Sequence, residues 1–406
     1  MKIWKLGAVA LTTVVGVATA VGPNSAAAQS ARAIERSGRT FHVAVCPRGN
    51  PAGTARCFAH QVVDARGTPI NGRANPAATP SGYGPAQLQA AYGLTGVTSS
   101  GTPTVAIVDA FAYPRAEQDL AVYRSQYSLP PCTTANGCLK IVGQTGGKPP
   151  SRVDTGWDQE QALDLDMVSA ACPNCHILLV QASSASFSNL WTGVDYAKSQ
   201  PGVRAVSNSY GNTDSSSYAQ YDSHYAGNNV AITVSSGDSG YGAQWPATAT
   251  GAVAVGGTSL RAGGGTRGWT ETVWNGAGSG CGLGHAKPTW QNGVTDACGG
   301  RMEADVSANA DPNTGVAVYG PVNRSTSSWG VWGGTSESSP FVAALFARRN
   351  GSINAASSIY AHRTSLNDVT SGSNGSCAVA YYCTGEVGYD GPTGLGTPNG
   401  LGAFSN

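Results

Sequence analysis

A serine near the C-terminal end of the chain stands between a glycine pair and an apolar run. Ser336 follows Gly333 and Gly334 and precedes Pro340, which opens the apolar run 341–347. Glycines permit a sharp turn, and proline suits the first turn of a helix, so we expect a buried helix from Pro340. A serine at such a turn faces free N–H groups and the positive end of the helix dipole, which favour an alkoxide or an oxyanion. We therefore predict that Ser336 is a nucleophile.

The same tetrapeptide, Gly-Gly-Thr-Ser, occurs a second time and ends at Ser259. Leu260, Arg261 and a glycine run follow that copy, with no sign of a helix. We interpret the copy that ends at Ser259 as a turn at the end of a strand, and the copy that ends at Ser336 as the one that holds the nucleophile.

A pair of acids in the segment 157–168 could supply the base. Glu160 and Asp164 are four residues apart, so on a helix they lie on one face. The apolar residues Leu163, Met167 and Ala171 flank the same direction. An ionised carboxylate is costly on such an inward face, and two close carboxyl groups share protons and titrate together. Such a pair can accept a proton from a serine hydroxyl in acid.

Other acids are interpreted differently. Asp158 and Asp166 point away from that face, and we expect them to be solvated. Asp109 ends the first predicted strand, and we interpret it as structural. Asp238 lies between glycines in the segment 235–240, just after a predicted strand, where it could approach a substrate backbone.

Histidine is an unsuitable base here. The six histidines are His42, His60, His176, His224, His285 and His362, and none precedes a glycine. The His-Gly-Thr segment that opens a helix in a Ser-His-Asp enzyme of the subtilisin type is therefore missing, and Glu160 stands in its place.

The composition indicates an exported protein. Residues 1–28 combine Lys2 and Lys5, an apolar stretch and three terminal alanines, which is typical of a signal peptide. No later segment is long and apolar enough to span a bilayer. With a net charge of +1 and 12% charged residues, the chain lacks the positive charge that attracts nucleic acid or anionic lipid. We expect a secreted, extracellular, monomeric protein.

The ten cysteines occur as near neighbours, which favours local disulfides in an exported chain. A structural disulfide is also favoured over half a zinc site for the Cys-x-x-Cys pair, because a second such pair is missing. The predicted pairs are Cys46–Cys57, Cys132–Cys138, Cys172–Cys175, Cys281–Cys298 and Cys377–Cys383.

The elements that must position these residues alternate between strands and helices. Residues 29–84 show little periodicity and are interpreted as a short pro-segment or linker, and residues 85–406 as the catalytic domain. In that domain we predict strands at 104–109, 176–180, 205–207, 230–234 and 252–255. Helices are predicted at 116–127, 159–171 and 188–198, with Ser188 as a plausible N-cap. Apolar strands that alternate with helices indicate an α/β fold with a parallel sheet covered on both faces.

Together, Glu160-Gln-Ala-Leu-Asp164, Ser236-Gly-Asp-Ser-Gly240 and Gly334-Thr-Ser-Glu-Ser-Ser-Pro340 resemble the sedolisin family of serine-carboxyl peptidases. The resemblance extends from about residue 85 to the C-terminus. It implies a subtilisin-like fold and hydrolysis of peptide bonds in proteins through an acyl-enzyme. It further implies that Ser336 is the nucleophile, Glu160 its general base and then acid, and Asp164 the residue that orients Glu160. Asp238 would be protonated and would donate a hydrogen bond to the oxyanion.

The resemblance also implies one structural calcium ion near the C-terminus. Its ligands would come from Asp368, Val369, Glu386, Gly388 and Asp390. Glu386 replaces a glycine of the family pattern, although its carbonyl could still bind. A second departure is the short segment 29–84, since the family usually carries a long folded pro-domain.

Two other functions compete with peptide hydrolysis. A secreted glycoside hydrolase could use Glu160 and Asp164 as acid and nucleophile, but Ser336 and Asp238 would then have no role. An inactive peptidase fold that only binds proteins is the third interpretation, and the intact set of four catalytic-type residues argues against it.

Overall fold

A computed structural model describes residues 33–70 and 80–406, which belong to one compact unit, Arg32–Asn406. The predicted signal peptide lies outside the described residues. Within them, every helix is too short or too polar to cross a bilayer.

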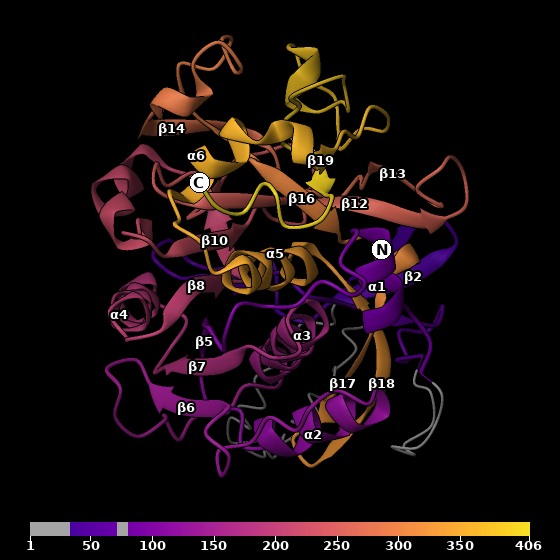
Figure 1. The fold of residues 1–406 in the computed structure, drawn as a ribbon, viewed down its shortest axis with the longest axis vertical. Coiled ribbons are helices and arrows are strands. Elements are labelled where there is room, and N and C mark those ends of the chain that lie inside the picture. Colours follow the sequence, from indigo (N-terminus) through magenta and orange to yellow (C-terminus); the bar gives the residue numbers. More distant parts are fainter. Residues whose placement is uncertain (1–32, 71–79) are drawn as a thin grey trace, which may run out of the picture. The chain divides into compact units, whose positions relative to one another are not determined.

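An eight-stranded sheet forms the centre of this unit (Figure 1). Seven strands follow the order β13-β12-β10-β8-β5-β7-β6, and β16 pairs with β12. All pairings are parallel except that of β12 with β13. The strands are β5 (Thr104–Ala110), β6 (Leu139–Gly143), β7 (His176–Ala182), β8 (Val203–Asn208), β10 (Ala231–Ser235), β12 (Val253–Ala262), β13 (Trp269–Val273) and β16 (Val306–Asn309).

Helices cover both faces of this sheet. Helix α4 lies on one side, and α3 and α5 lie together on the other (Figure 1). The predicted α/β class with a parallel sheet is therefore confirmed. The α-helices are α1 (Pro85–Ala91), α2 (Ala116–Gln126), α3 (Thr155–Ala171), α4 (Phe187–Lys198), α5 (Thr335–Arg349) and α6 (Ala355–Ala361). The 3₁₀ helices span Ser216–Tyr225, Thr289–Gln291, Pro312–Thr314, Arg363–Ser365 and Ala380–Tyr382.

Two helix starts differ from the sequence prediction. Helix α4 is capped by Ser186, whose hydroxyl accepts a hydrogen bond from the Asn189 N–H, so Ser188 is not the N-cap. Helix α5 begins at Thr335, five residues before Pro340. Because proline has no N–H, the Ser336 carbonyl lacks the helical hydrogen bond that residue 340 would otherwise donate. The first turn is helical all the same.

The N-terminal segment contains regular structure that its sequence did not predict. Strands β1 (Ile34–Ser37), β2 (Thr40–Ala44) and β4 (His60–Val63) join β18 (Thr326–Gly333) and β17 (Val316–Asn323) in a five-stranded antiparallel sheet. Strand β3 (Arg56–Cys57) pairs with β9 (Tyr210–Thr213), which also pairs with β11 (Gln244–Trp245). The described part of the segment, residues 33–70, is therefore paired with strands of the rest of the chain, and the assignment of 29–84 as a pro-segment or linker stays a prediction.

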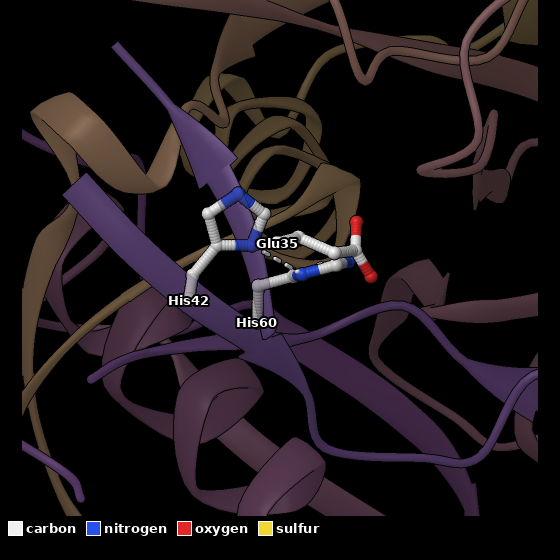
Figure 2. A group of neighbouring side chains, drawn as sticks. All are labelled: Glu35, His42 and His60. Carbon is white, nitrogen blue, oxygen red and sulfur yellow. Dashed lines mark hydrogen bonds between the residues drawn. The ribbon is translucent and has the colours of Figure 1, made fainter. Parts of the chain in front are cut away.

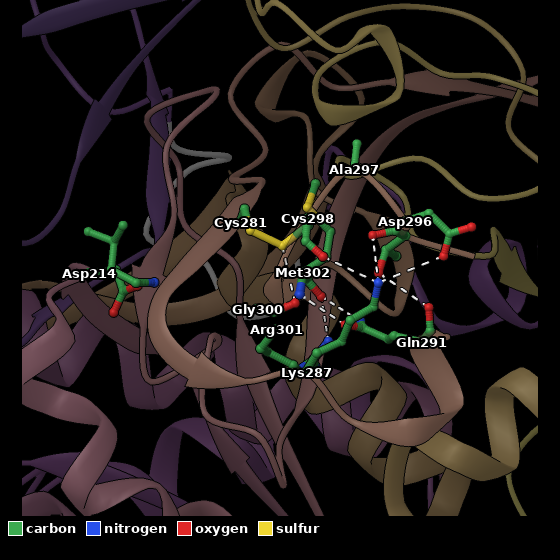
Figure 3. Close-up of a disulfide and its surroundings, with 12 residues drawn as sticks. Asp214, Cys281, Lys287, Gln291, Asp296, Ala297, Cys298, Gly300, Arg301 and Met302 are labelled. Atoms are coloured by element: carbon green, nitrogen blue, oxygen red, sulfur yellow. Dashed lines mark hydrogen bonds and ion pairs between the residues drawn. A yellow bond between two sulfur atoms is a disulfide. The ribbon is translucent and has the colours of Figure 1, made fainter. Parts of the chain in front are cut away.

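All five predicted disulfides are confirmed. Figure 3 shows Cys281–Cys298, which joins β14 (Gly280–Ala286) to the loop before β15 (Gly300–Glu303). The Lys287 ammonium donates to the carbonyls of Thr295 and Cys298 at 2.9 and 3.2 Å. The last two strands are β19 (Leu366–Asn367) and β20 (Thr397–Pro398).

Candidate active site

Ser336 lies in the first turn of α5 and is fully buried. The turn before it requires Gly334, whose φ of +102° is disfavoured for other residues. A Cβ at Gly334 would also lie only 2.0 Å from the Phe58 carbonyl oxygen and 2.6 Å from Asp238 Oδ2. The glycine thus lets the Phe58 carbonyl and the Asp238 carboxyl group approach the backbone two residues before Ser336. The second candidate, Ser259, lies inside β12, not at its end, and its hydroxyl bonds Asp311 Oδ2 at 2.6 Å.

Glu160 and Asp164 are fully buried on helix α3, and their carboxyl groups act on each other. Glu160 Oε2 accepts the Ala59 N–H at 2.8 Å, and Oε1 is buried without a hydrogen-bond partner among the described residues. The Ser336 hydroxyl donates to the Ser209 carbonyl at 3.3 Å, and it lies close enough to the Glu160 carboxyl group to act on its pKa. Asp164 Oδ1 accepts the Ser209 hydroxyl at 2.8 Å. The helix is fixed at its start by Asp154, whose side chain accepts from two N–H groups of the first turn. Sequence spacing therefore predicted correctly that the pair points inward.

Burial raises the pKa of Glu160 well above its ordinary value, and the nearby Asp109 raises it further. The pKa of Asp164 is raised well above its usual range by burial, by Asp109 and by Glu160. The three carboxyl groups therefore form one cluster that holds protons together. Asp109, interpreted as structural from the sequence, belongs to this cluster, and burial raises its pKa to about 8. Its place at the end of β5 was the available signal, since parallel strands present functional groups at their carboxyl ends.

The prediction that Asp158 and Asp166 form a solvated face of α3 is wrong. Asp158 and Asp166 are only 3% and 1% exposed. Strand β17 packs against that side of the helix, and the Tyr319 N–H donates to Asp166 Oδ2 at 3.0 Å. Helix α3 is therefore enclosed on all sides, which the pattern of one helix could not reveal.

Asp238 lies beyond β10 and turns its carboxyl group toward the start of α5. Its Oδ1 accepts the Thr335 N–H at 2.8 Å and the Thr335 hydroxyl at 2.7 Å. Burial raises the pKa of Asp238 to about 7, although these hydrogen bonds and Arg56 oppose the rise. Oδ2 is the oxygen beside Gly334, so a proton carried there below neutral pH can be donated next to Ser336.

Two histidines of the N-terminal segment lie close to Asp238. His60 Nε2 is 3.3 Å from Asp238 Oδ2, and its Nδ1 is 2.9 Å from His42 Nδ1. Figure 2 shows both rings beside Glu35, whose carboxylate pairs with Arg48 at 2.6 Å. Burial lowers the pKa of His42 to about 4 and that of His60 well below its ordinary value. Burial therefore favours the uncharged form of both rings. The titratable group near the Ser336 hydroxyl is the carboxyl group of Glu160, and its role as the general base stays a prediction.

The predicted calcium ligands come together in part. Asp368 Oδ2 accepts the Gly388 N–H at 2.9 Å, and Asp390 Oδ2 accepts the Glu386 N–H at 3.3 Å. The Asp368 charge acts on Asp390, so these two carboxylates lie near each other. Hard oxygen donors of this kind suit Ca²⁺, and a cation would relieve the repulsion between the two acids.

Known proteins share this chain's sequence and fold. Sedolisin from Pseudomonas sp. (strain 101) is 26% identical over 372 residues, which cover 79% of this chain and 60% of that protein. Kumamolisin from Bacillus sp. (strain MN-32) is 29% identical over 364 residues, which cover 80% and 63% of the two chains. The chain thus spans less than two thirds of the length of these relatives.

A solved structure of Pseudomonas sedolisin, a serine-carboxyl proteinase complexed with two molecules of pseudo-iodotyrostatin, matches with a TM-score of 0.66 and 24% identity. It covers 79% of this chain and 96% of that one. A lanthipeptide protease matches with a TM-score of 0.51 and 13% identity, over 79% and 93% of the chains. These matches confirm the subtilisin-like fold and the resemblance to sedolisins. The subtilase family profile, Peptidase_S8, matches residues 145–368, more than half of the sequence, and the chain belongs to the subtilase family.

Proposed function

We propose that this chain is a secreted serine-carboxyl peptidase that hydrolyses peptide bonds of proteins or peptides in acid. The observation that carries the proposal is the burial of the Glu160 carboxyl group near the Ser336 hydroxyl, with an oxygen, Oε1, that has no other hydrogen-bond partner among the described residues. A nucleophile beside a base that is free to accept its proton is the arrangement that acyl transfer needs. The relatives sedolisin and kumamolisin support the same reaction class.

In the proposed reaction, the Ser336 oxygen attacks the substrate carbonyl and its proton passes to ionised Glu160. Asp238 has a pKa of about 7 and is therefore protonated in acid. In this form it donates a hydrogen bond to the oxyanion. Glu160 then delivers the proton to the leaving amine, and water releases the acyl group by the same steps in reverse order. Asp164 orients Glu160 and keeps its proton affinity high.

Calcium is part of the proposal as one structural ion. Asp368 and Asp390 would supply carboxylate oxygens, and Val369, Glu386 and Gly388 would supply carbonyl oxygens. The ion would fix the C-terminal loop and take no part in bond cleavage.

The proposal is tested by incubating the purified protein with denatured protein and, separately, with polysaccharide at pH 4 and pH 7. We expect digestion of protein at pH 4 and no release of sugar. Ser336→Ala and Glu160→Gln should each lower the rate by about a thousandfold or more, and the double variant should be no worse. Sugar release that survives Ser336→Ala would favour a glycoside hydrolase instead.

A further inference from the structure

Three side chains of the N-terminal strands meet on one face of the five-stranded sheet. Glu35 of β1 lies directly opposite His42 of β2 in the antiparallel register. His60 of β4 lies opposite Ala44, which is two residues from His42 along β2. Because side chains alternate between the two faces of a sheet, positions that are directly opposite, or diagonal by two residues, share a face. Three neighbouring strands thus bring one carboxylate and two imidazoles together.

These three groups are close enough to bind a single metal ion. Glu35, His42 and His60 each offer one ligand atom, and these atoms all lie within 4.8 Å of one another (Figure 2). The Nδ1 atoms of His42 and His60 are 2.9 Å apart. Two nitrogens that each bind one Zn²⁺ at about 2.0–2.1 Å are separated by roughly 3 Å, so the rings need little movement. Two histidines and one glutamate are a ligand set that zinc accepts in proteins, and it leaves a fourth position open.

The second ring nitrogen of His60 faces the kind of group that supports a metal-binding histidine. Its Nε2 is buried without a hydrogen-bond partner among the described residues, and it lies 3.3 Å from Asp238 Oδ2. A histidine that binds a metal through one nitrogen usually turns its other N–H toward a carboxylate or a carbonyl, which fixes the ring. With Nδ1 on the ion, His60 would carry its proton on Nε2, toward Asp238. Asp238 would then be the outer partner of this ligand.

An ion can reach these groups from the solvent. A pocket of about 180 Å³ is lined in part by Glu35, His42 and Asp238. The side chains of Glu35 and Arg48 are 27% and 44% exposed, and they form an ion pair at 2.6 Å. The Arg48 guanidinium thus competes with a metal for the Glu35 carboxylate. An ion pair this exposed is weak, so Arg48 can move aside at little cost when an ion binds.

We propose that Glu35, His42 and His60 form a zinc site on the N-terminal strands, beside Asp238. Two imidazoles and one carboxylate suit Zn²⁺ and similar transition-metal ions, whereas Ca²⁺ and Mg²⁺ prefer oxygen ligands alone. The site is distinct from the proposed calcium site near the C-terminus, and it does not depend on the proposed peptidase function. A bound ion joins β1, β2 and β4 through three side chains, so zinc stabilises the folded chain by mass action.

The test uses the full chain with Ser336→Ala, purified without a histidine tag, in a buffer that contains calcium so that the C-terminal site stays loaded. Calorimetric titration with zinc chloride at pH 7 should show one ion bound per chain, and zinc should raise the melting temperature by several degrees. Cobalt chloride should give the visible absorption of four-coordinate Co²⁺, and an excess of magnesium should not displace the zinc. A folded chain that shows no saturable binding of zinc would overturn the proposal.

Matched variants locate the ion. His42→Gln should weaken zinc binding by about a hundredfold or more, since losing even an outer partner of a ligand costs about 10- to 100-fold. Glu35→Gln, at a partly exposed side chain that the fold does not need, should weaken it at least about tenfold. Arg48→Gln should tighten binding because the competing cation is gone, and His362→Gln, at a histidine on the C-terminal side of α6, should leave it unchanged. Circular dichroism confirms that each variant is folded. Zinc binding that neither Glu35→Gln nor His42→Gln weakens would overturn the proposal, whatever the peptidase assays show.

Discussion

Asp109 offers a test of the buried carboxyl cluster through stability alone. Burial raises its pKa from 3.8 to about 8, so the folded state holds a proton that the unfolded chain releases above pH 3.8. Stability attributable to this residue is therefore present in strong acid and is lost as pH rises from 3.8 to 8. Within that interval, each pH unit lowers the free energy of unfolding by about 1.4 kcal/mol, so at pH 7 the loss is about 4 kcal/mol.

Asparagine resembles a protonated aspartate in shape and does not ionise. In a Ser336→Ala background, which prevents self-digestion, Asp109→Asn should change stability little at pH 4 and raise it by up to about 4 kcal/mol at pH 7. Urea unfolding followed by tryptophan fluorescence at both pH values measures the difference. Asp296→Asn, at a side chain that is 79% exposed, is the matched control and should have little effect at either pH. An equal effect of Asp109→Asn at pH 4 and pH 7 would refute the proposed protonation of the cluster.

The remaining predictions concern the metal, the catalytic pair and alkaline stability. Chelation should lower the melting temperature, Asp390→Ala should reproduce the loss, and an unchanged melting curve with no co-purified metal would exclude the calcium site. Asp164→Asn should reduce the rate of peptide hydrolysis less than Glu160→Gln, because it perturbs the base without removing it, and the reverse order would contradict these roles. Burial disfavours the charged ring of His285, but hydrogen bonds to Asp214 and Asp222 outweigh it and raise its pKa to about 9. The stability that the charged ring contributes is complete below pH 6.5 and is lost as pH rises to 9. In urea unfolding, His285→Gln should therefore lower the free energy of unfolding by up to about 3 kcal/mol at pH 6 and by much less at pH 9.5.

Local patterns in the sequence predicted the central elements well. The apolar run at 104–109 predicted β5, and the four-residue spacing of Glu160 and Asp164 predicted their common face on α3. Both are properties of a few consecutive residues, since side-chain direction in a strand or helix follows from its period. The disulfides were predictable for a similar reason, because each closes a short loop.

The errors come from partners that are distant in the sequence. Asp158 and Asp166 were assigned to solvent because nothing near them indicates the hairpin β17–β18, which packs on that side. The segment 29–84 shows little periodicity because its strands are short and are completed by β18 and β9. Helix α5 begins before Pro340 because the glycine turn and Thr335, bonded to Asp238, fix its first turn.

The pH dependence of peptide hydrolysis tests the central claim most directly. Initial rates from pH 2 to pH 9, measured on the purified protein, should form a bell confined to acid. The rate falls at low pH as Glu160 becomes protonated, and it falls toward neutrality as Asp238 loses its proton near pH 7. In Asp238→Asn, which keeps a donor at every pH, the rate should be lower and its decline toward neutrality weaker. A wild-type maximum at pH 8 would contradict a carboxyl base and a carboxyl oxyanion donor, and with them the serine-carboxyl mechanism.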